Sequence, residues 1–216
     1  MAQKTLLITR PFYENPTNYL YYWSKPLIEF AKNKRFIVID LAKEKAVRKE
    51  IEGRLKKVKP DLVVLNGHGS EKEIFGQNGE ILLAVGESEK LLVDKIIYTR
   101  ACLSAKLFGK SCIKHGTKAY IGYQEDFIFI FDTTYTAEPL KDKIAALFME
   151  PSNQTVKSLL KGNSAKKSNE SGKNAFLKNI LKLLTSETRK EESDTVRYLI
   201  WDMKHQVCLG NPDAII

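Results

Sequence analysis

One histidine and one cysteine in this sequence each follow a strongly apolar run. The run 62–66 leads into His68, which has a glycine on either side, and the run 95–101 leads into Cys102. A thiol beside an imidazole can act as a nucleophile with its base, because the sulfur attacks a carbonyl carbon while the imidazole moves the proton. Either residue alone has an ordinary explanation, since isolated cysteines and histidines commonly have structural roles. Their matching placement makes them candidate catalytic residues.

The two apolar runs predict buried β-strands that carry His68 and Cys102 to their carboxyl ends. Neighbouring strands of an open parallel sheet end at the same edge, so the two side chains are expected to meet there. A helix face at Leu103, Leu107 and Ile113 predicts that Cys102 precedes a helix amino terminus. The helix dipole would then favour the thiolate and lower the pKa of the cysteine.

Alternation of apolar strands and amphipathic helices along the chain predicts an α/β fold, a three-layer α/β/α sandwich with a mostly parallel sheet. Asn78-Gly79 between apolar residues predicts a hairpin over 73–82 beside the histidine. The expected strands are 4–9, 36–41, 62–66, 95–102, 118–123, 196–203 and 206–209, and the expected helices are 16–30, 42–58, 88–94, 103–115, 137–149, 153–160 and 176–184.

Length and composition indicate one globular domain over residues 1–216. A segment rich in Ser, Asn, Lys and Gly predicts a flexible loop at about 162–174. The amino terminus lacks a signal-peptide pattern and no apolar run is long enough to cross a bilayer, so we expect a cytoplasmic protein without a membrane partner. Three cysteines are too few for a disulfide framework. The net charge of +9 has two possible explanations: binding to an anionic partner, or solubility alone.

The order of these motifs resembles the caspase-related cysteine peptidases, which include caspases, metacaspases, gingipains, separases and CHAT-type proteins. The resemblance lies in the segment Gly67-His68-Gly69, the hairpin and the pair Ala101-Cys102, and it continues in 119–123 and in the closing segment 207–212. The caspase signature Gln-Ala-Cys-x-Gly appears here as Arg-Ala-Cys-Leu-Ser, and Cys102 follows His68 by 34 residues, a shorter interval than in caspases.

The resemblance implies a cysteine endopeptidase that works through a Cys-His dyad and a thioester acyl-enzyme, without a cofactor. Cys102 would be the nucleophile and His68 its acid-base partner, and the N–H groups of Gly69 and Cys102 would hold the oxyanion. No third catalytic residue is evident. The implied partners are a protein or peptide substrate and a regulatory protein.

The resemblance also assigns substrate-binding positions to Arg10 and Arg100. Two guanidinium groups at the cleft would favour an acidic side chain or a carboxylate. Glu125 or Asp126 could instead neutralise these arginines or receive a basic residue.

Three other functions stay open from the sequence. An inactive caspase-like scaffold would bind protein partners through the same cleft without turnover. Cys112-x-x-His115 could join Cys102 or His68 in a metal site, although one such pair is a weak signal. The positive charge would suit a basic nucleic-acid-binding α/β protein, but charge runs are commonly solvated faces and no aromatic-basic recognition motif is present.

Overall fold

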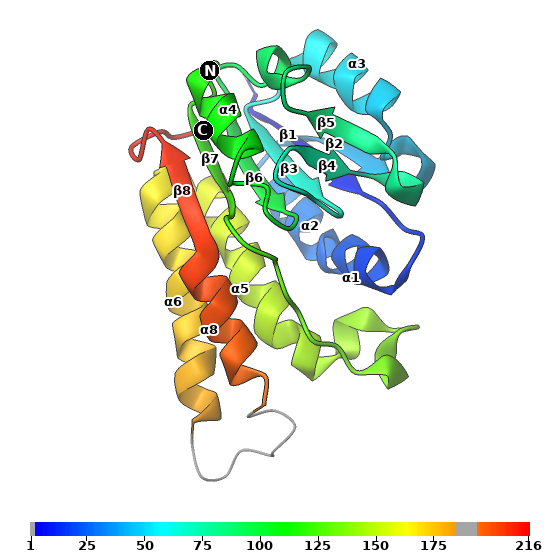
Figure 1. Ribbon diagram of the computed structural model, residues 1–216, viewed down its shortest axis with the longest axis vertical. Helices are drawn as coiled ribbons and strands as arrows, with labels where there is room; N and C mark the ends of the chain where they lie inside the picture. The colour runs from blue at the N-terminus through cyan, green and yellow to red at the C-terminus, as the bar shows by residue number, and fades with distance from the viewer. Residues whose placement is uncertain (1–2, 185–193) are drawn as a thin grey trace.

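A six-stranded sheet forms the centre of the computed structural model, which describes residues 3–184 and 194–216 (Figure 1). Its strands, in the order β2-β1-β3-β6-β7-β8, are parallel except for β8, which runs antiparallel to β7 at the edge. The strands are β1 (Thr5–Arg10), β2 (Ile37–Ala42), β3 (Leu62–Asn66), β6 (Ile96–Arg100), β7 (Ala119–Tyr123) and β8 (Gln206–Gly210). The predicted mostly parallel α/β sheet is confirmed.

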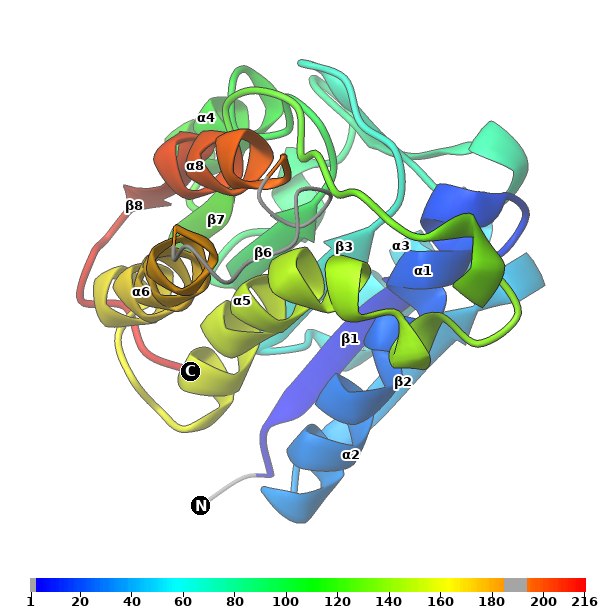
Figure 2. The ribbon, with the colours of Figure 1, turned by 90° about the horizontal axis from the view of Figure 1, so that it is seen from below.

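Helices cover both faces of this sheet (Figures 1 and 2). Helices α3 (Arg48–Val58) and α4 (Phe108–Lys114) pack on one face, and α2 (Lys25–Asn33), α5 (Lys143–Leu160) and the start of α6 (Ala165–Leu183) pack on the other. Helix α1 (Asn15–Trp23) leads directly into α2, and α8 (Val196–His205) packs against α6 before the chain enters β8. The result is the predicted three-layer sandwich.

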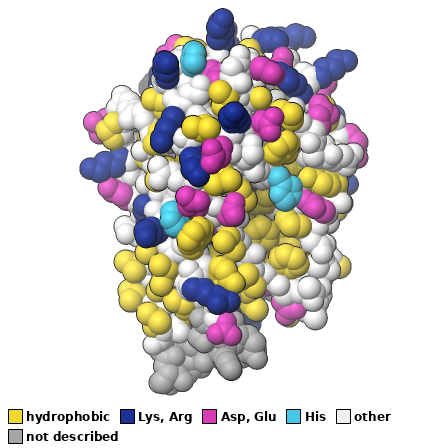
Figure 3. Space-filling view, viewed as in Figure 1, with side chains coloured by type: hydrophobic (Ala, Val, Ile, Leu, Met, Phe, Trp, Pro, Cys, Tyr) yellow, Lys and Arg dark blue, Asp and Glu magenta, His cyan; other side chains and the backbone are white. Residues whose placement is uncertain are grey.

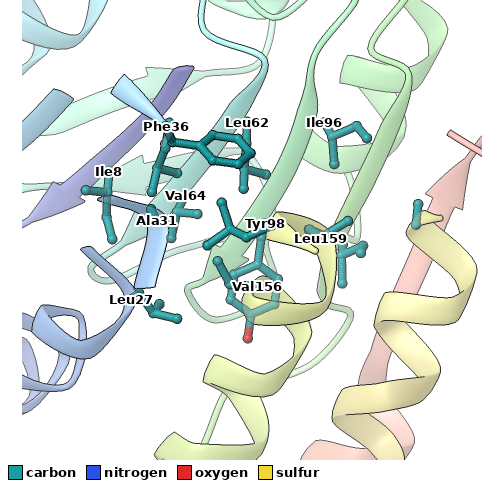
Figure 4. Packing of buried hydrophobic residues seen from close by; sticks show 14 of the residues in the cluster. Ile8, Leu27, Ala31, Phe36, Leu62, Val64, Ile96, Tyr98, Val156 and Leu159 are labelled. Carbon is teal, nitrogen blue, oxygen red and sulfur yellow. The ribbon is translucent and has the colours of Figure 1, made fainter. Parts of the chain in front are cut away.

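Alternate residues of each central strand supply the two cores. Leu62 and Val64 pack toward α2 and α5, whereas Val63 and Leu65 pack toward α3 and α4. Figure 4 shows the first core, in which Tyr98 of β6 lies against Val156 of α5. Strands buried on both faces need apolar side chains at successive positions, which explains why they appear in the sequence as continuous apolar runs.

A small hairpin follows the histidine, as predicted. Strands β4 (Glu73–Phe75) and β5 (Ile81–Ala84) pair antiparallel. Asn78 and Gly79 in the connection have φ angles of 54° and 74°, the left-handed conformation that these two residue types adopt most readily. An isolated bridge between Gly69 and Ile74 joins the hairpin to the histidine segment.

The predicted flexible loop at 162–174 is wrong, because most of it belongs to α6. Ser164 caps this helix by accepting the backbone N–H of Lys167. The polar composition serves close packing against α5: Ser168 donates to Ser158 across 3.1 Å, and Gly172 is so near α5 that an added Cβ would lie 2.0 Å from Oγ1 of Thr155. Small polar residues that look like a linker therefore form a helix interface.

Several other predicted elements also differ from the structure. The segment 196–203 was expected to be a strand, but it is helical in α8, whose buried residues Leu199 and Asp202 lie three apart as on a helix face. The helices expected at 137–149 and 153–160 join in α5, which contains Pro151. The helix expected at 88–94 is one 3-10 turn at Glu89–Leu91.

The substitution Gly172→Ala tests the contact between α5 and α6. Alanine favours a helix over glycine by about 1 kcal/mol, but here the added methyl group would overlap Thr155, so we expect a net loss of about 1–3 kcal/mol in the free energy of unfolding. Gly53 of α3 is the matched control, because an added Cβ would meet nothing within 4 Å. Gly53→Ala should raise the free energy of unfolding in the same urea titration. If Gly172→Ala also raised it, the close contact between α5 and α6 at Gly172 would be contradicted.

Charges of both signs are mixed on one face of the molecule. On the face shown in Figure 3, lysine and arginine side chains are interspersed with acidic ones rather than gathered in one patch. Within residues 3–184 and 194–216, no helix combines the length and apolar character needed to cross a bilayer.

Candidate active site

Strand register places His68 and Cys102 at the same edge of the sheet. Strands β3 and β6 are parallel neighbours, and Asn66, the last residue of β3, pairs with Arg100, the last residue of β6. The candidate residues each lie two positions beyond this pair. The juxtaposition expected from the sequence therefore follows from the ladder itself.

Two glycines let the histidine segment approach its neighbours closely. A Cβ on Gly69 would lie 2.4 Å from the carbonyl oxygen of Cys102 and 2.9 Å from Cβ of Ala101. Gly67 has a φ of 147°, and a Cβ there would lie 2.0 Å from the carbonyl oxygen of Phe75 in the hairpin. The Gly-His-Gly pattern thus allows the histidine segment to pack between the cysteine segment and the hairpin.

His68 and Cys102 line one cavity of about 310 Å³, here named the His-Cys cavity. Its other walls come from Gly67, Arg100 and Ala101, from the start of α1 with Pro16, Thr17 and Leu20, and from the segment after β7 with Asp126, Phe127, Ile128, Phe129 and Phe131. The imidazole is exposed and the cysteine is half-buried, so a ligand can reach both.

Burial raises the pKa of the Cys102 thiol to about 11, and the nearby carboxylate of Asp126 adds to this effect. The prediction of a pKa lowered by a helix dipole is wrong. Turns occupy the residues directly after Cys102, Leu103 has a left-handed φ of 57°, and α4 begins only at Phe108. The resting sulfur is therefore a neutral thiol at pH 7 that needs a base to react.

Alkylation by iodoacetamide should report this raised pKa. Because only the thiolate reacts, the rate at Cys102 should rise about tenfold per pH unit between pH 7 and pH 9.5, as expected well below a pKa of about 11. Peptide mapping by mass spectrometry separates Cys102 from Cys112 and Cys208. A rate independent of pH over this interval would show a preformed thiolate and contradict the neutral resting state.

Glu14 is a functional candidate that the sequence analysis missed. Its carboxylate oxygen Oε1 contacts Nε2 of His68, which leaves Nδ1 of the ring for proton transfer. The backbone of Glu14 is fixed at the start of α1, where Thr17 Oγ1 accepts its N–H at 3.2 Å. The only local signal in the sequence is an acidic residue just before a helix, and its partner is 54 residues away.

Two backbone N–H groups are available near the sulfur. The bridge between the histidine segment and the hairpin uses the N–H groups of Ser70 and Phe75, at 2.9 Å each. In the part of the chain that the structure describes, the N–H groups of Gly69 and Cys102 have no protein acceptor. The two segments are in direct contact, which makes these two donors the candidates for an oxyanion-binding site.

Arg100 is buried and its hydrogen bonds are satisfied within the protein. Its guanidinium donates to Asn66 Oδ1 at 2.7 Å, Ser24 Oγ at 2.7 Å and Asn153 Oδ1 at 2.9 Å, and 0% of the residue is exposed. Burial lowers the pKa of this arginine from its usual value. Arg100 thus joins β3, β6, α5 and the junction of α1 and α2 at the wall of the cavity, and these contacts give no support to the predicted capture of a substrate carboxylate.

Arg10 and Asp126 are placed differently from each other. Arg10 pairs with Asp40, donating from Nε at 2.8 Å and from Nη2, and its guanidinium lies 4.2 Å from the ring centroid of Tyr21. It is absent from the walls of the His-Cys cavity. Asp126 does line the cavity, with an exposed side chain, while its carbonyl accepts from Trp201 Nε1 at 3.0 Å.

The alternative metal ligands do not converge. Cys112 is fully buried in the core between the sheet and α4, whereas His115 is exposed and its Nδ1 contacts the carbonyl of Ser111 at 2.8 Å. Within residues 3–184 and 194–216, no group of three His, Cys, Asp or Glu side chains is arranged to hold a metal ion.

No protein-family model and no curated protein sequence matches the chain significantly. Solved structures do match. That of the Arg-specific cysteine proteinase gingipain R (RgpB) aligns with a TM-score of 0.59 and 14% identity over 99% of this chain. The complex of the RgpB pro- and mature domains of Porphyromonas gingivalis aligns with a TM-score of 0.54 and 13% identity, again over 99% of this chain. The matched regions are 47% and 48% of those chains, so this protein spans about half their length. The chain therefore has the caspase-like α/β fold that is found in a cysteine proteinase.

Proposed function

We propose that this protein is a cysteine endopeptidase in which Cys102 is the nucleophile and His68 is the general acid-base. The observation that carries the proposal is the convergence of both side chains on one cavity from neighbouring parallel strands. The fold shared with a cysteine proteinase supports protein or peptide substrates for this chain. The proposal goes beyond the predicted dyad by adding Glu14, which would orient His68.

The raised thiol pKa defines the first chemical step. His68 takes the proton from Sγ of Cys102 as the sulfur attacks the carbonyl carbon of the scissile peptide bond. The resulting oxyanion accepts hydrogen bonds from the backbone N–H groups of Gly69 and Cys102. Each well-aligned hydrogen bond would stabilise the transition state by about 3 kcal/mol. His68 then returns the proton to the leaving amine, the C–N bond breaks and a thioester remains on Cys102. Water, deprotonated by His68, hydrolyses the thioester and restores the thiol.

Glu14 stabilises the imidazolium that forms when His68 holds the proton. The substitution Glu14→Gln keeps the shape of the side chain but removes its charge, so we expect kcat/KM to fall about 10- to 100-fold. Stability should be nearly unchanged, because both partners are exposed.

Glu71→Gln is the matched control for this variant. Glu71 lies between His68 and strand β4 and forms an exposed ion pair of 2.8 Å with Lys106. Its loss should leave kcat/KM unaltered, and equal activities of the Glu14→Gln and Glu71→Gln proteins would remove Glu14 from the mechanism.

Cleavage of an unbiased peptide library, with products identified by mass spectrometry, tests the proposed activity. We expect internal peptide bonds to be cut by the wild type and to stay intact with Cys102→Ala. Binding of peptides without cleavage by either protein would instead support the alternative of an inactive scaffold for protein partners. The interspersed charges in Figure 3 give no positive support to the nucleic-acid alternative.

A regulatory protein partner and a cytoplasmic location also belong to this proposal. The solved complex of RgpB pro- and mature domains supports the idea that a protein segment can act on this fold. The single-domain organisation and the cytoplasmic location stay predictions from the sequence.

A further inference from the structure

We propose that the His-Cys cavity selects a large apolar side chain, such as that of Phe, Leu or Met, on the residue whose carbonyl carbon Cys102 attacks. This residue is called P1 below. The inference rests on the proposed peptidase function, and it differs from the arginine specificity named for RgpB.

Apolar side chains make up most of the cavity wall. Pro16 and Leu20 come from α1, and Phe127, Ile128, Phe129 and Phe131 come from the segment after β7. A volume of about 310 Å³ is enough for one large side chain. Transfer of an apolar P1 group from water into such a wall is favourable, whereas a basic group would lose hydration with one exposed carboxylate, that of Asp126, as its partner on the wall.

Two charged groups, Arg100 in the cavity wall and Glu14 beside His68, are already engaged within the protein. Arg100 donates to Asn66, Ser24 and Asn153 and is fully buried, so it is not free to pair with an acidic P1 side chain. Glu14 contacts His68. Asp126 is the remaining carboxylate on the wall, and it lies near the Cys102 thiol, whose pKa it helps to raise. Because this residue is exposed, solvent screens its charge and weakens its attraction for a basic P1 group.

The apolar wall is held in place before a ligand arrives. The ring of Phe127 packs against that of Tyr123 in a tilted arrangement, with centroids 4.7 Å apart. The rings of Phe131 and Tyr19 pack in the same way at the same distance. The N–H of Ile128 donates to the buried carboxyl of Asp202 in α8 at 3.0 Å. A preformed apolar site avoids the entropic cost of ordering its walls, which increases its preference for a complementary side chain.

Peptidyl acyloxymethyl ketones that differ only at P1 test the inference. The protein is treated with the Phe, Leu, Arg, Lys and Asp forms, and the adduct on Cys102 is followed by mass spectrometry. We expect the Phe and Leu forms to react at least about tenfold faster than the others, the scale set by apolar pocket discrimination. Faster reaction of the Arg, Lys or Asp form would overturn the inference while leaving the peptidase function standing.

A binding assay separates this inference from the proposed chemistry. Product-like peptides ending in Phe, Arg or Asp are titrated into the Cys102→Ala protein, which cannot react. Tightest binding of the Phe peptide supports the apolar site even if the wild type proves inactive, and equal or weaker binding of that peptide overturns it.

Pro16→Asp supplies a gain-of-preference test with Pro16→Ala as its control. Position 16 lines the cavity in the first turn of α1, where a carboxylate is compatible with the helix dipole. We expect the Asp variant to raise reaction with the Arg probe relative to the Phe probe by about tenfold, and the Ala variant to keep the Phe preference. An unchanged probe ratio in Pro16→Asp would contradict the assignment of this cavity to P1.

Discussion

Cys102→Ala is expected to lower kcat/KM by at least about 10⁴-fold, because the variant has no atom that can form the acyl-enzyme. His68→Ala should cost nearly as much, since the thiol has a pKa of about 11 and needs a base near pH 7. Both values come from initial rates on a peptide that the wild type cleaves. The double variant should be no slower than Cys102→Ala alone, because the two residues act in one step.

Cys208→Ala is the control for these two variants. Cys208 is half-buried in β8 and lies outside the walls of the His-Cys cavity. Its substitution should leave kcat/KM unchanged. If Cys102→Ala retained wild-type activity, the nucleophile would have to be another group and the proposed mechanism would fail.

Arg100→Ala is expected to lower the free energy of unfolding by about 3–5 kcal/mol. The variant leaves Asn66 Oδ1 and Asn153 Oδ1 buried without their donor and opens a cavity where a fully buried side chain had been. The burial that lowers the pKa of Arg100 offsets part of this loss, because the substitution also removes the cost of burying a cation. The loss of hydrogen bonds and packing is the larger effect, since this side chain of β6 is bonded to β3, to α5 and to the junction of α1 and α2.

Urea titration measures the effect, with Arg54→Ala as the control. Arg54 forms an exposed pair with Glu50 at 3.7 Å, so its loss should change stability by less than about 0.5 kcal/mol. If the two variants were equally stable, the network around Arg100 would not be structural, and a substrate-binding role for this arginine would regain support.

The sheet and the placement of the two candidate residues were predictable because they depend on local patterns. Strands covered on both faces leave continuous apolar runs, and parallel neighbours end at one edge, so His68 and Cys102 could be brought together from the sequence alone. The hairpin was predictable for a similar reason, since Asn78 and Gly79 favour left-handed conformations in its connection.

The features that were missed depend on contacts between distant residues. The polar stretch in α6 resembles a linker until Ser168 and Gly172 are seen against α5. Glu14 acquires its role only by reaching His68 from another element. The pKa of Cys102 depends on how deeply the thiol is buried, and the contacts of Arg100 with Asn66 and Asn153 can be recognised only in three dimensions.

Intact-mass measurement after treatment with a peptidyl acyloxymethyl ketone is the decisive experiment for Cys102 as the nucleophile and His68 as its base. We expect a single covalent adduct that maps to Cys102, is absent from Cys102→Ala and forms far more slowly in His68→Ala. Adducts distributed over Cys102, Cys112 and Cys208 would rule out Cys102 as the specific nucleophile. An equal rate of adduct formation at Cys102 in the wild type and in His68→Ala would rule out His68 as its base.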